Sequence, residues 1–251
     1  MALETHLESF YVSPENVHGN TLLVTGAEFV HLTKVLRKRV GDQVVAVDGC
    51  GNWYEIGIVS VGRDFAKAEI LKQLRLFGEP VVEVTLAPAV IKGPRFDWLV
   101  EKATEIGVRR ILPVFSQRCV VVPGELKKKR WQRIAIAAMK QCGRSVLPQI
   151  LEGISFADIM KKYGNTPIKL IAEAGSKDSI RRIVAPFREK KSDFPRKALI
   201  LVGPEGSFTS EELQLAQDHG FRSVSLGTRR LRSETAAIMA ATLLLWELED
   251  L

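Results

Sequence analysis

One segment near the carboxyl end of the chain constrains its fold more than any other. Residues 199–202 form an apolar run that stops abruptly at the turn Gly203-Pro204-Glu205-Gly206. A short run of this kind is typical of a strand that is covered on both faces. After the turn, Thr209 and Glu212 have the spacing of a capping box, which marks the start of a helix. The sequence therefore predicts a buried strand, a loop and a helix in direct succession.

A second loop of the same kind lies about twenty residues further on. Residues 226–235 follow a short predicted strand, 223–226, and open another predicted helix. Taken alone, a Gly-Pro-x-Gly turn is more often only a connection between elements. However, Gly203 and Gly206 carry no Cβ, so backbone amides in the first loop can approach a ligand closely. Two such loops from one sheet could hold one ligand.

The chain changes character near residues 73–80. The part before this point has short β-branched segments separated by Gly or Asp turns, as in a small barrel. These segments are 21–24, 43–48, 53–61 and 67–71. From Val81, strand patterns alternate with helical ones, which predicts an α/β domain with a parallel sheet. The strands expected there are 81–90, 110–115, 168–173, 198–202 and 223–226. We therefore expect a β-barrel domain over residues 1–74 and an α/β domain over residues 80–251.

Two helices are expected between these strands. Apolar residues recur at helical spacing over 96–106, and Gly107 supplies a stop at the helix end. A comparable stripe over 131–142 leaves Gln141 and Arg144 free to point elsewhere.

In the first part, Gly49-x-Gly51 has no third Gly and no following helix, so it indicates a hairpin turn and not a dinucleotide site.

The net charge of +7 is concentrated in the middle of the chain. Residues 77–144 contain 13 Lys and Arg against 6 Asp and Glu, so this segment alone carries the equivalent of the whole excess. A basic surface of this size suits phosphate contacts with a nucleic acid. The run at 127–130 could equally be a solvated helix start. A second, local basic patch at residues 34–39 could also touch RNA.

Composition and spacing argue against several other classes of protein. The amino terminus lacks a basic region followed by an apolar run, which excludes a secretory signal, and the longest apolar stretch, 236–246, is too short to span a membrane. Three cysteines and four histidines lack metal-ligand spacing, so no metal site and no disulfide framework are expected. We expect reduced thiols and a cytoplasmic location.

The two loops together resemble the cofactor-binding signature of the SPOUT methyltransferases. Their full sequence motifs, Gly-Pro-Glu-Gly and then Leu-Gly-x-x-x-Leu-Arg-x-Glu-Thr, closely resemble those of one branch, the RsmE family. That family methylates N3 of a uridine in small-subunit (16S) ribosomal RNA. The resemblance continues through residues 31–37, 101–108, 116–119 and 134–144, so it covers nearly the whole chain. Ser207 departs from the pattern, because the family usually has a third small Gly there.

The resemblance implies a PUA-like RNA-binding barrel followed by a SPOUT domain with a carboxy-terminal trefoil knot. S-adenosylmethionine would sit in that knot. On the loops and on an earlier strand end, the implied cofactor-binding residues are Ala172, Glu173, Val202, Gly203, Pro204, Glu205, Gly206, Leu226, Gly227, Thr228 and Leu231. Methyl transfer from a sulfonium needs positioning of donor and acceptor and requires no metal.

Uracil N3 carries a proton and is a poor nucleophile until that proton leaves. The site should therefore stabilise a developing uracil anion, for which Arg is suited because it is planar and always charged. Arg118, Arg144 and Arg232 occupy family motif positions and are the candidates. Glu205 and Glu234 are candidate proton acceptors, although Glu234 could instead only compensate the charge at a helix start.

The implied partners are ribosomal RNA or the small ribosomal subunit, and a second copy of the chain in a homodimer. The candidate RNA-binding residues are His31, Lys34, Arg37, Arg39, Lys92, Arg118 and Arg144. Two alternatives stay open at this level. The same fold could methylate a different acceptor, such as a ribose 2′-hydroxyl or a purine nitrogen. The chain could also be a catalytically silent ribosome-assembly factor, although its intact loops count against this.

Overall fold

The computed structural model describes residues 8–119, 125–188 and 196–249. The chain forms two compact units. The first contains residues 1–79 and 136–147, and the second contains residues 80–135 and 148–251. These units differ from the predicted division in one segment, 136–147, which belongs to the first unit although it follows 56 residues of the second.

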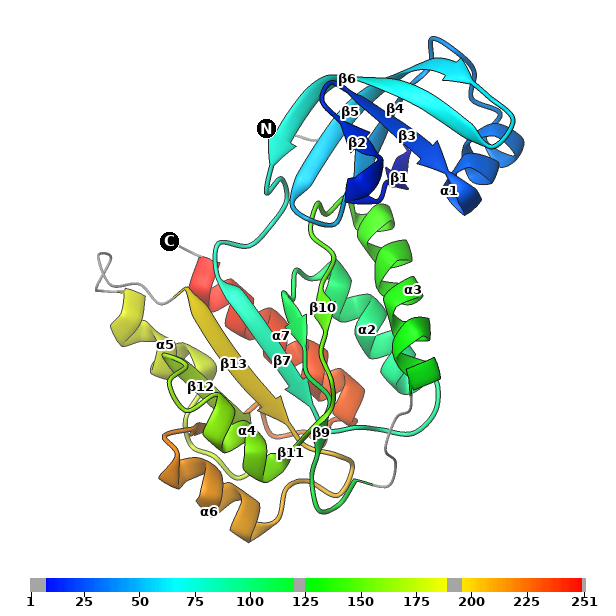
Figure 1. Ribbon diagram of the computed structural model, residues 1–251. Helices are drawn as coiled ribbons and strands as arrows, with labels where there is room; N and C mark the ends of the chain where they lie inside the picture. Colours follow the sequence, from blue (N-terminus) through cyan, green and yellow to red (C-terminus); the bar gives the residue numbers. More distant parts are fainter. Residues whose placement is uncertain (1–7, 120–124, 189–195, 250–251) are drawn as a thin grey trace. The chain divides into compact units, whose positions relative to one another are not determined.

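The first unit is built on one six-stranded sheet. Its elements are β1 (Ser9–Tyr11), η1 (Pro14–Asn16), β2 (Val17–His18), β3 (Thr21–Thr25), α1 (Gly26–Val30), η2 (His31–Val35), β4 (Gln43–Val47), β5 (Asn52–Val61) and β6 (Phe65–Arg75) (Figure 1). The strand order is β1-β4-β5-β6-β3-β2, and every pairing is antiparallel except that of β1 with β4. The predicted hairpin turn at Gly49-x-Gly51 joins β4 to β5.

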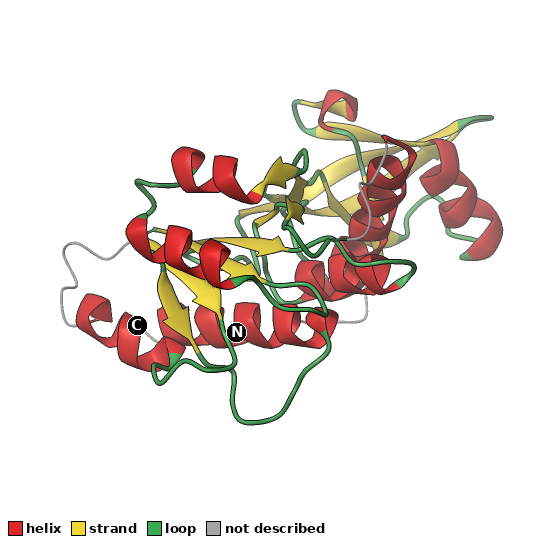
Figure 2. Ribbon diagram, turned by 90° about the horizontal axis from the view of Figure 1, so that it is seen from below, coloured by secondary structure: helices red, strands yellow, loops and turns green. Residues whose placement is uncertain are grey.

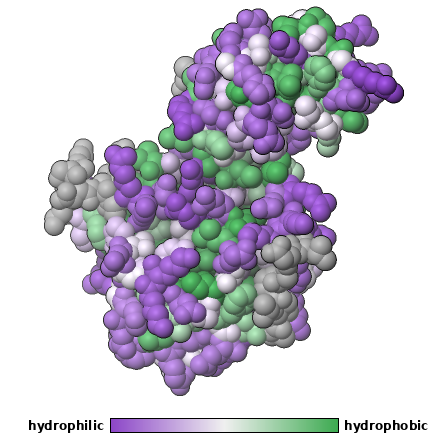
Figure 3. Space-filling view, viewed as in Figure 1, coloured by the Kyte–Doolittle hydropathy of each residue, from purple (hydrophilic) through white to green (hydrophobic). Residues whose placement is uncertain are grey.

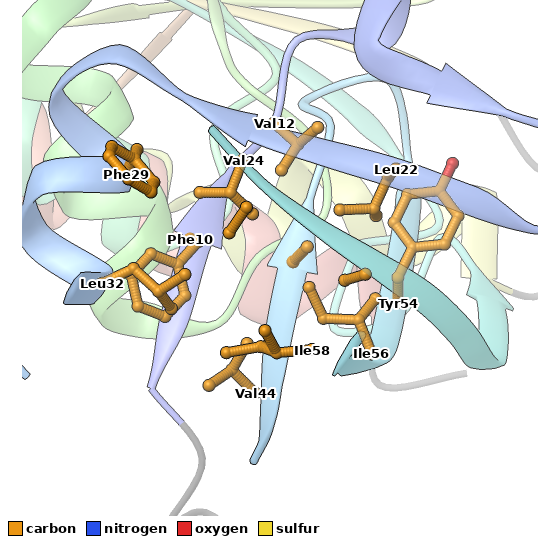
Figure 4. Close-up of a cluster of buried hydrophobic side chains, with 13 residues drawn as sticks. Phe10, Val12, Leu22, Val24, Phe29, Leu32, Val44, Tyr54, Ile56 and Ile58 are labelled. Atoms are coloured by element: carbon orange, nitrogen blue, oxygen red, sulfur yellow. The ribbon is translucent and has the colours of Figure 1, made fainter. Parts of the chain in front are cut away.

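Period-two alternation in these strands produces the core of the first unit. Leu22 and Val24 of β3, and Ile56 and Ile58 of β5, alternate with more exposed residues and are at most 2% exposed. Figure 4 shows these side chains directed at one another from different strands, with Phe10 among them. β1, which supplies Phe10, is too short for the sequence pattern to predict.

The segment 136–147 is tied to the first unit by a buried ion pair. The Arg144 guanidinium lies 2.7 Å from the Glu79 carboxylate, and both side chains are at most 4% exposed. The same carboxylate accepts hydrogen bonds from the backbone N–H groups of Ser145, at 2.9 Å, and Val146, at 2.8 Å. The expectation that Arg144 is free to point elsewhere is therefore wrong, because its charge is satisfied inside the unit. Gln141 is exposed as expected.

The second unit contains a six-stranded parallel sheet. Its elements are β7 (Glu83–Pro88), α2 (Arg95–Glu105), β8 (Arg110–Ile111), β9 (Val114–Phe115), α3 (Glu125–Cys142, whose last turns belong to the first unit), β10 (Gln149–Ile150), β11 (Ile154–Ser155), α4 (Phe156–Lys162), β12 (Ile168–Ala172), α5 (Ile180–Arg188), β13 (Lys197–Val202), α6 (Ser210–Asp218), β14 (Arg222–Val224) and α7 (Ser233–Glu249). The strand order is β10-β8-β7-β13-β12-β14, and β9 pairs separately with β11. The parallel sheet predicted from alternating patterns is confirmed.

Helices cover both faces of this sheet (Figure 2). On one face, α4 and α6 pack on inward residues such as Leu199 and Leu201 of β13. On the other face, α7 lies against β7 and β13, with α2 and α5 packed beside it. The buried face of α7 carries mostly small or flexible apolar residues, namely Ala237, Ala240, Ala241, Leu244 and Leu248. β13 is thus covered on both sides, as its continuous apolar sequence predicts.

One predicted strand is interrupted in the structure, and one predicted helix is confirmed together with its stop. The strand expected over 110–115 is broken into β8 and β9 at Pro113, which has no N–H to donate to a ladder. The helix expected over 96–106 is confirmed as α2, and it is followed by Gly107 with a φ of 99°, a left-handed conformation that favours Gly.

Polar and charged residues (purple) cover most of the visible surface of each unit (Figure 3). Within the described part of the chain, no helix combines the length and the apolarity needed to cross a membrane.

Candidate active site

Three loops leave the parallel sheet of the second unit at the same edge. The register pairs Ile171 of β12 with Leu201 of β13, and Ala172 of β12 with Val224 of β14. Because these strands are parallel and in this register, the segments after residues 172, 202 and 224 begin side by side. The carboxyl edge of a parallel sheet is where α/β proteins place their ligand sites.

A cavity of about 280 Å³ lies between these loops. Nine residues that the sequence predicted for cofactor binding line it: Ala172, Glu173, Val202, Gly203, Pro204, Glu205, Leu226, Gly227 and Leu231. Gly206 and Thr228, also predicted, do not line it. Further lining residues, which the sequence did not predict for cofactor binding, are Ala174, Gly175, Ser207, Phe208, Leu213, Arg229, Arg230, Ser233 and Ala236. The structure thus gathers one set of side chains from three separate loops.

Phe208 and Leu213 were missed, although the sequence contains a signal for them. Phe208 stands immediately before the N-cap Thr209, and Leu213 stands at the fourth helical position after it. This is the spacing of a hydrophobic staple. The structure buries Phe208 and packs Leu213 against the same core cluster. A staple beside the capping box therefore forms one wall of the cavity and fixes how the chain enters α6.

The turn after β13 requires an unusual backbone at its last position. Ser207 has a φ of 58°, and its N–H donates to the Pro204 carbonyl at 2.9 Å. Only Gly adopts such a φ without steric cost. The requirement explains why Gly suits this position in the resembled family, and Ser207 is accommodated here on an exposed turn.

The cavity loops are held together by polar contacts through Glu205. Its carboxylate lies 2.8 Å from the Arg95 guanidinium, and its carbonyl oxygen accepts a hydrogen bond from Arg230 at 3.5 Å. Arg95 stands at the start of α2 and Arg230 belongs to the loop after β14. The Gly-Pro-Glu-Gly turn is therefore tied to two other segments of the same unit.

The capping box of α6 also positions the segment that carries Arg118. Both predicted bonds between Thr209 and Glu212 are present, and a second oxygen of Glu212 accepts the Gln117 N–H at 2.8 Å. The Arg118 guanidinium then donates to the Gly206 carbonyl. At the same helix start, the pKa of the Glu211 carboxyl is lowered, first by a hydrogen bond from its own backbone N–H and then by one from the Thr209 hydroxyl.

Gly206 supports this arrangement although it does not line the cavity. A Cβ added there would lie 3.1 Å from Cδ of Arg118. The absence of a side chain at Gly206 thus lets the exposed Arg118 reach across the mouth of the loop.

The other predicted catalytic residues occupy different environments. Arg232 is exposed between Leu231 and Ser233, which both line the cavity. Glu234 lies in the first turn of α7 and is only 7% exposed. Its Oε2 atom has no hydrogen-bond donor among the residues that the structure describes. Arg144 belongs to the first unit and does not line the cavity.

The predicted RNA-binding residues lie in both units. Lys34, Arg37 and Arg39 of the first unit are exposed, whereas the His31 ring is partly buried and lies 5.7 Å from that of Phe10. In the second unit, Lys92 is exposed.

Comparison with known proteins assigns this architecture to a family. Residues 78–245 match the RNA methyltransferase domain family, and residues 24–71 match the RNA methyltransferase PUA domain family. The chain belongs to the RNA methyltransferase family. It is similar to the ribosomal RNA small subunit methyltransferase E of Mesomycoplasma hyopneumoniae, with 37% identity over 179 residues that cover 70% of this chain and 75% of the relative.

Other relatives of this RNA methyltransferase cover more of the chain. The protein of the same name from Synechocystis is 31% identical over 91% of this chain and 74% of its own. A solved ribosomal RNA small subunit methyltransferase E from Neisseria gonorrhoeae, bound to S-adenosyl methionine, superposes with a TM-score of 0.82 at 32% identity, over 95% of this chain and 97% of that one.

Proposed function

We propose that this RNA methyltransferase transfers a methyl group from S-adenosylmethionine to N3 of a uridine in small-subunit ribosomal RNA. Its family and its relatives support the more general part of this proposal, that the protein is an S-adenosylmethionine-dependent methyltransferase of that RNA. The uridine N3 acceptor rests on the resemblance of the two loop motifs to the RsmE family. The observation that carries the proposal is the cavity. Three loops of the second unit, which we call the catalytic unit from here on, line it together.

The residues around the cavity suit S-adenosylmethionine. A volume of about 280 Å³ lies near the lower bound of small-molecule sites, roughly 300 Å³. Leu226 and Leu231 supply apolar walls for an adenine ring, and Glu173 supplies a carboxylate at the end of β12. Backbone groups of the two glycine-containing loops can bond the ribose and the adenine edge. Gly206 and Thr228 remain proposed contacts, since they adjoin lining residues.

Replacing Gly203 with Val is expected to weaken S-adenosylmethionine binding strongly. Even a Cβ at this position would lie 3.3 Å from the ring and the backbone N of Phe208, which lines the cavity. A branched side chain there must displace the Phe208 wall or enter the cavity, and restoring the binding geometry then costs about 1–3 kcal/mol. This cost is taken from the free energy of binding, so the dissociation constant should rise roughly 5- to 150-fold. Titration calorimetry of the protein without RNA measures this, with Gly203→Ala as a milder control. Unchanged affinity in a folded Gly203→Val protein would refute the cavity as the cofactor site.

The bound cofactor supplies a methyl group activated by its sulfonium. The protein's own residues then prepare the acceptor. Arg118 and Arg232, near the cavity mouth, stabilise the negative charge that develops on the uracil ring as N3 loses its proton. Glu234 accepts that proton, directly or through a water molecule, because its Oε2 atom has no donor among the described residues. Arg144 takes no part in the chemical step and has a structural role, through its pair with Glu79 in the first unit.

Two further proposals concern the chain as a whole. The first is a trefoil knot, which is supported by the order of the strands: β13 enters between the earlier β7 and β12, and the chain then continues to β14 beyond β12.

The second is a homodimer through α7, supported by the 70% exposure of Trp246 on that helix. Large exposed apolar side chains mark interaction sites when they cluster, and Trp98 of the adjacent α2 is also 41% exposed. The mass of the protein in solution tests the second proposal.

Nucleoside mass spectrometry of small-subunit ribosomal RNA tests the proposed reaction. We expect one 3-methyluridine to be present in RNA from cells that contain the protein and absent without it, and to be restored by purified protein with S-adenosylmethionine. A ribose-methylated nucleoside or a methylated purine in its place would keep the enzyme class and overturn the acceptor. No change in any nucleoside would contradict the proposed reaction.

A further inference from the structure

A second cavity lies in the catalytic unit, apart from the one described above. Its volume is about 340 Å³. The segment after β7 forms one side through Val90, Ile91 and Pro94, and the beginning of α3 forms another through Lys127 and Trp131. It shares no lining residue with the cavity proposed for the cofactor.

Two aromatic side chains form the floor of this second cavity. The rings of Phe96 and Trp131 lie 4.3 Å apart at an angle of 32°, and both residues are at most 4% exposed. The Trp131 Nε1–H donates to Asp97 at 3.0 Å. The only polar atom of the indole is therefore satisfied from within the protein, so the two rings offer the cavity apolar edges and no free donor.

The rim of the cavity is positively charged. Arg130 lies 2.8 Å from Asp97, but its side chain is 66% exposed, so it remains accessible to solvent. Lys127 is also exposed and makes no salt bridge with another residue that the structure describes. Asp97 can neutralise at most one of these two cations, so the rim keeps an excess of positive charge.

An apolar pocket with cations at its rim matches the chemistry of a nucleotide. The faces of a base are apolar and stack on aromatic side chains, whereas the attached phosphate is anionic. A duplex would not admit a base to such a pocket, so the occupant must be unpaired. The excess of positive charge at the rim disfavours a cationic ligand. A purely apolar occupant would make no contact that uses the cations at the rim.

The position of the cavity links it to the proposed reaction. The Ala89 N–H donates to the Val202 carbonyl at 2.7 Å, so the segment after β7 starts beside the Gly-Pro-Glu-Gly turn. Arg95, between lining residues Pro94 and Phe96, forms its ion pair with Glu205 of that turn. The two cavities therefore open from neighbouring strands of one sheet.

We propose that the second cavity binds an unpaired nucleotide of the RNA substrate, next to Phe96 and Trp131, with its phosphate at Lys127 and Arg130. This inference rests on the proposed function and deepens it. The methylated base must reach the cofactor cavity to react, so the occupant of the second cavity is a different nucleotide of the same RNA. The second cavity thus contributes to the choice of substrate and not to the chemical step.

A matched pair of variants tests the phosphate contact. Lys127→Gln and Lys129→Gln remove the same charge from exposed positions on the same helix, but only Lys127 lines the cavity. Long-range effects of charge are thus nearly equal in the two variants. Affinity for protein-free small-subunit ribosomal RNA is measured over a series of salt concentrations. The slope of log affinity against log salt is negative, and we expect its magnitude to decrease by about 0.7–0.9 for Lys127→Gln, as for one lost phosphate contact. For Lys129→Gln we expect no change in the slope.

Ultraviolet cross-linking of the wild-type protein to the same RNA tests the base contact. We expect nucleotide adducts on the peptides that contain Phe96 or Trp131, located by mass spectrometry. Equal slopes for the two variants, or adducts confined to other peptides, would overturn this inference. Methyl transfer by the wild-type protein is measured in parallel, and its absence would contradict the proposed function separately, since cross-linking and salt dependence need no reaction.

Discussion

Replacing Arg144 with Ala is expected to lower the free energy of unfolding of the first unit by about 3–5 kcal/mol. The substitution leaves the Glu79 carboxylate, which is only 4% exposed, without its cationic partner. Breaking a buried pair from one side is costly because the remaining charge stays desolvated. Chemical denaturation followed by circular dichroism measures the loss.

A graded control separates this effect from catalysis. Arg144→Lys keeps the charge but cannot reproduce the two contacts that Nε and Nη2 make with Glu79, at 3.2 and 2.7 Å, so it should recover only part of the stability. The free energy of unfolding should therefore be highest for the wild-type protein, lower for Arg144→Lys and lowest for Arg144→Ala. An Arg144→Ala protein of normal stability that binds S-adenosylmethionine but transfers no methyl group would contradict the structural role. It would restore the catalytic role that the motif position suggests.

Replacing Arg118 with Ala is expected to reduce the rate of methyl transfer about 10²–10³-fold at saturating RNA and cofactor. Arg118 is exposed and reaches the Gly206 carbonyl, beside the turn that lines the cavity proposed for the cofactor. A fixed guanidinium at this position can stabilise a developing uracil anion, which exists only as the proton leaves N3. Loss of such a donor therefore acts on the chemical step and not on ground-state binding. Single-turnover rates measure it directly.

The bond between Arg118 and Gly206 provides the competing explanation. If Arg118 only shapes the loop, Arg118→Ala should weaken S-adenosylmethionine binding while the rate at saturating cofactor stays normal. Calorimetry on the same variant separates these outcomes. Arg118→Lys should recover only part of the rate, because an ammonium lacks the planar, two-pronged contact of a guanidinium. A normal single-turnover rate in Arg118→Ala would refute the catalytic role.

Local patterns were sufficient for the elements that line the cavity proposed for the cofactor. The apolar run before Gly203 predicted a strand buried on both faces, and the spacing of Thr209 and Glu212 predicted the capping box that the structure contains. Helical periodicity likewise predicted α2 with its Gly107 stop. These features depend on residues a few positions apart, and their steric and hydrogen-bonding requirements are visible in the sequence itself.

Contacts between distant segments could be decided only by the tertiary structure. No pattern in the sequence indicated that Glu79 would meet Arg144, or that the helix stripe over 131–142 would end in a different unit from the one in which it begins. The patterns also did not predict the strand order, in which β13 enters between β7 and β12. That the ends of three strands would share one pocket was implied only by the resemblance. Periodicity specifies which face of an element is apolar but not which partner covers it. The partner is set by the packing of the whole chain, and the burial of Arg144 follows from that packing alone.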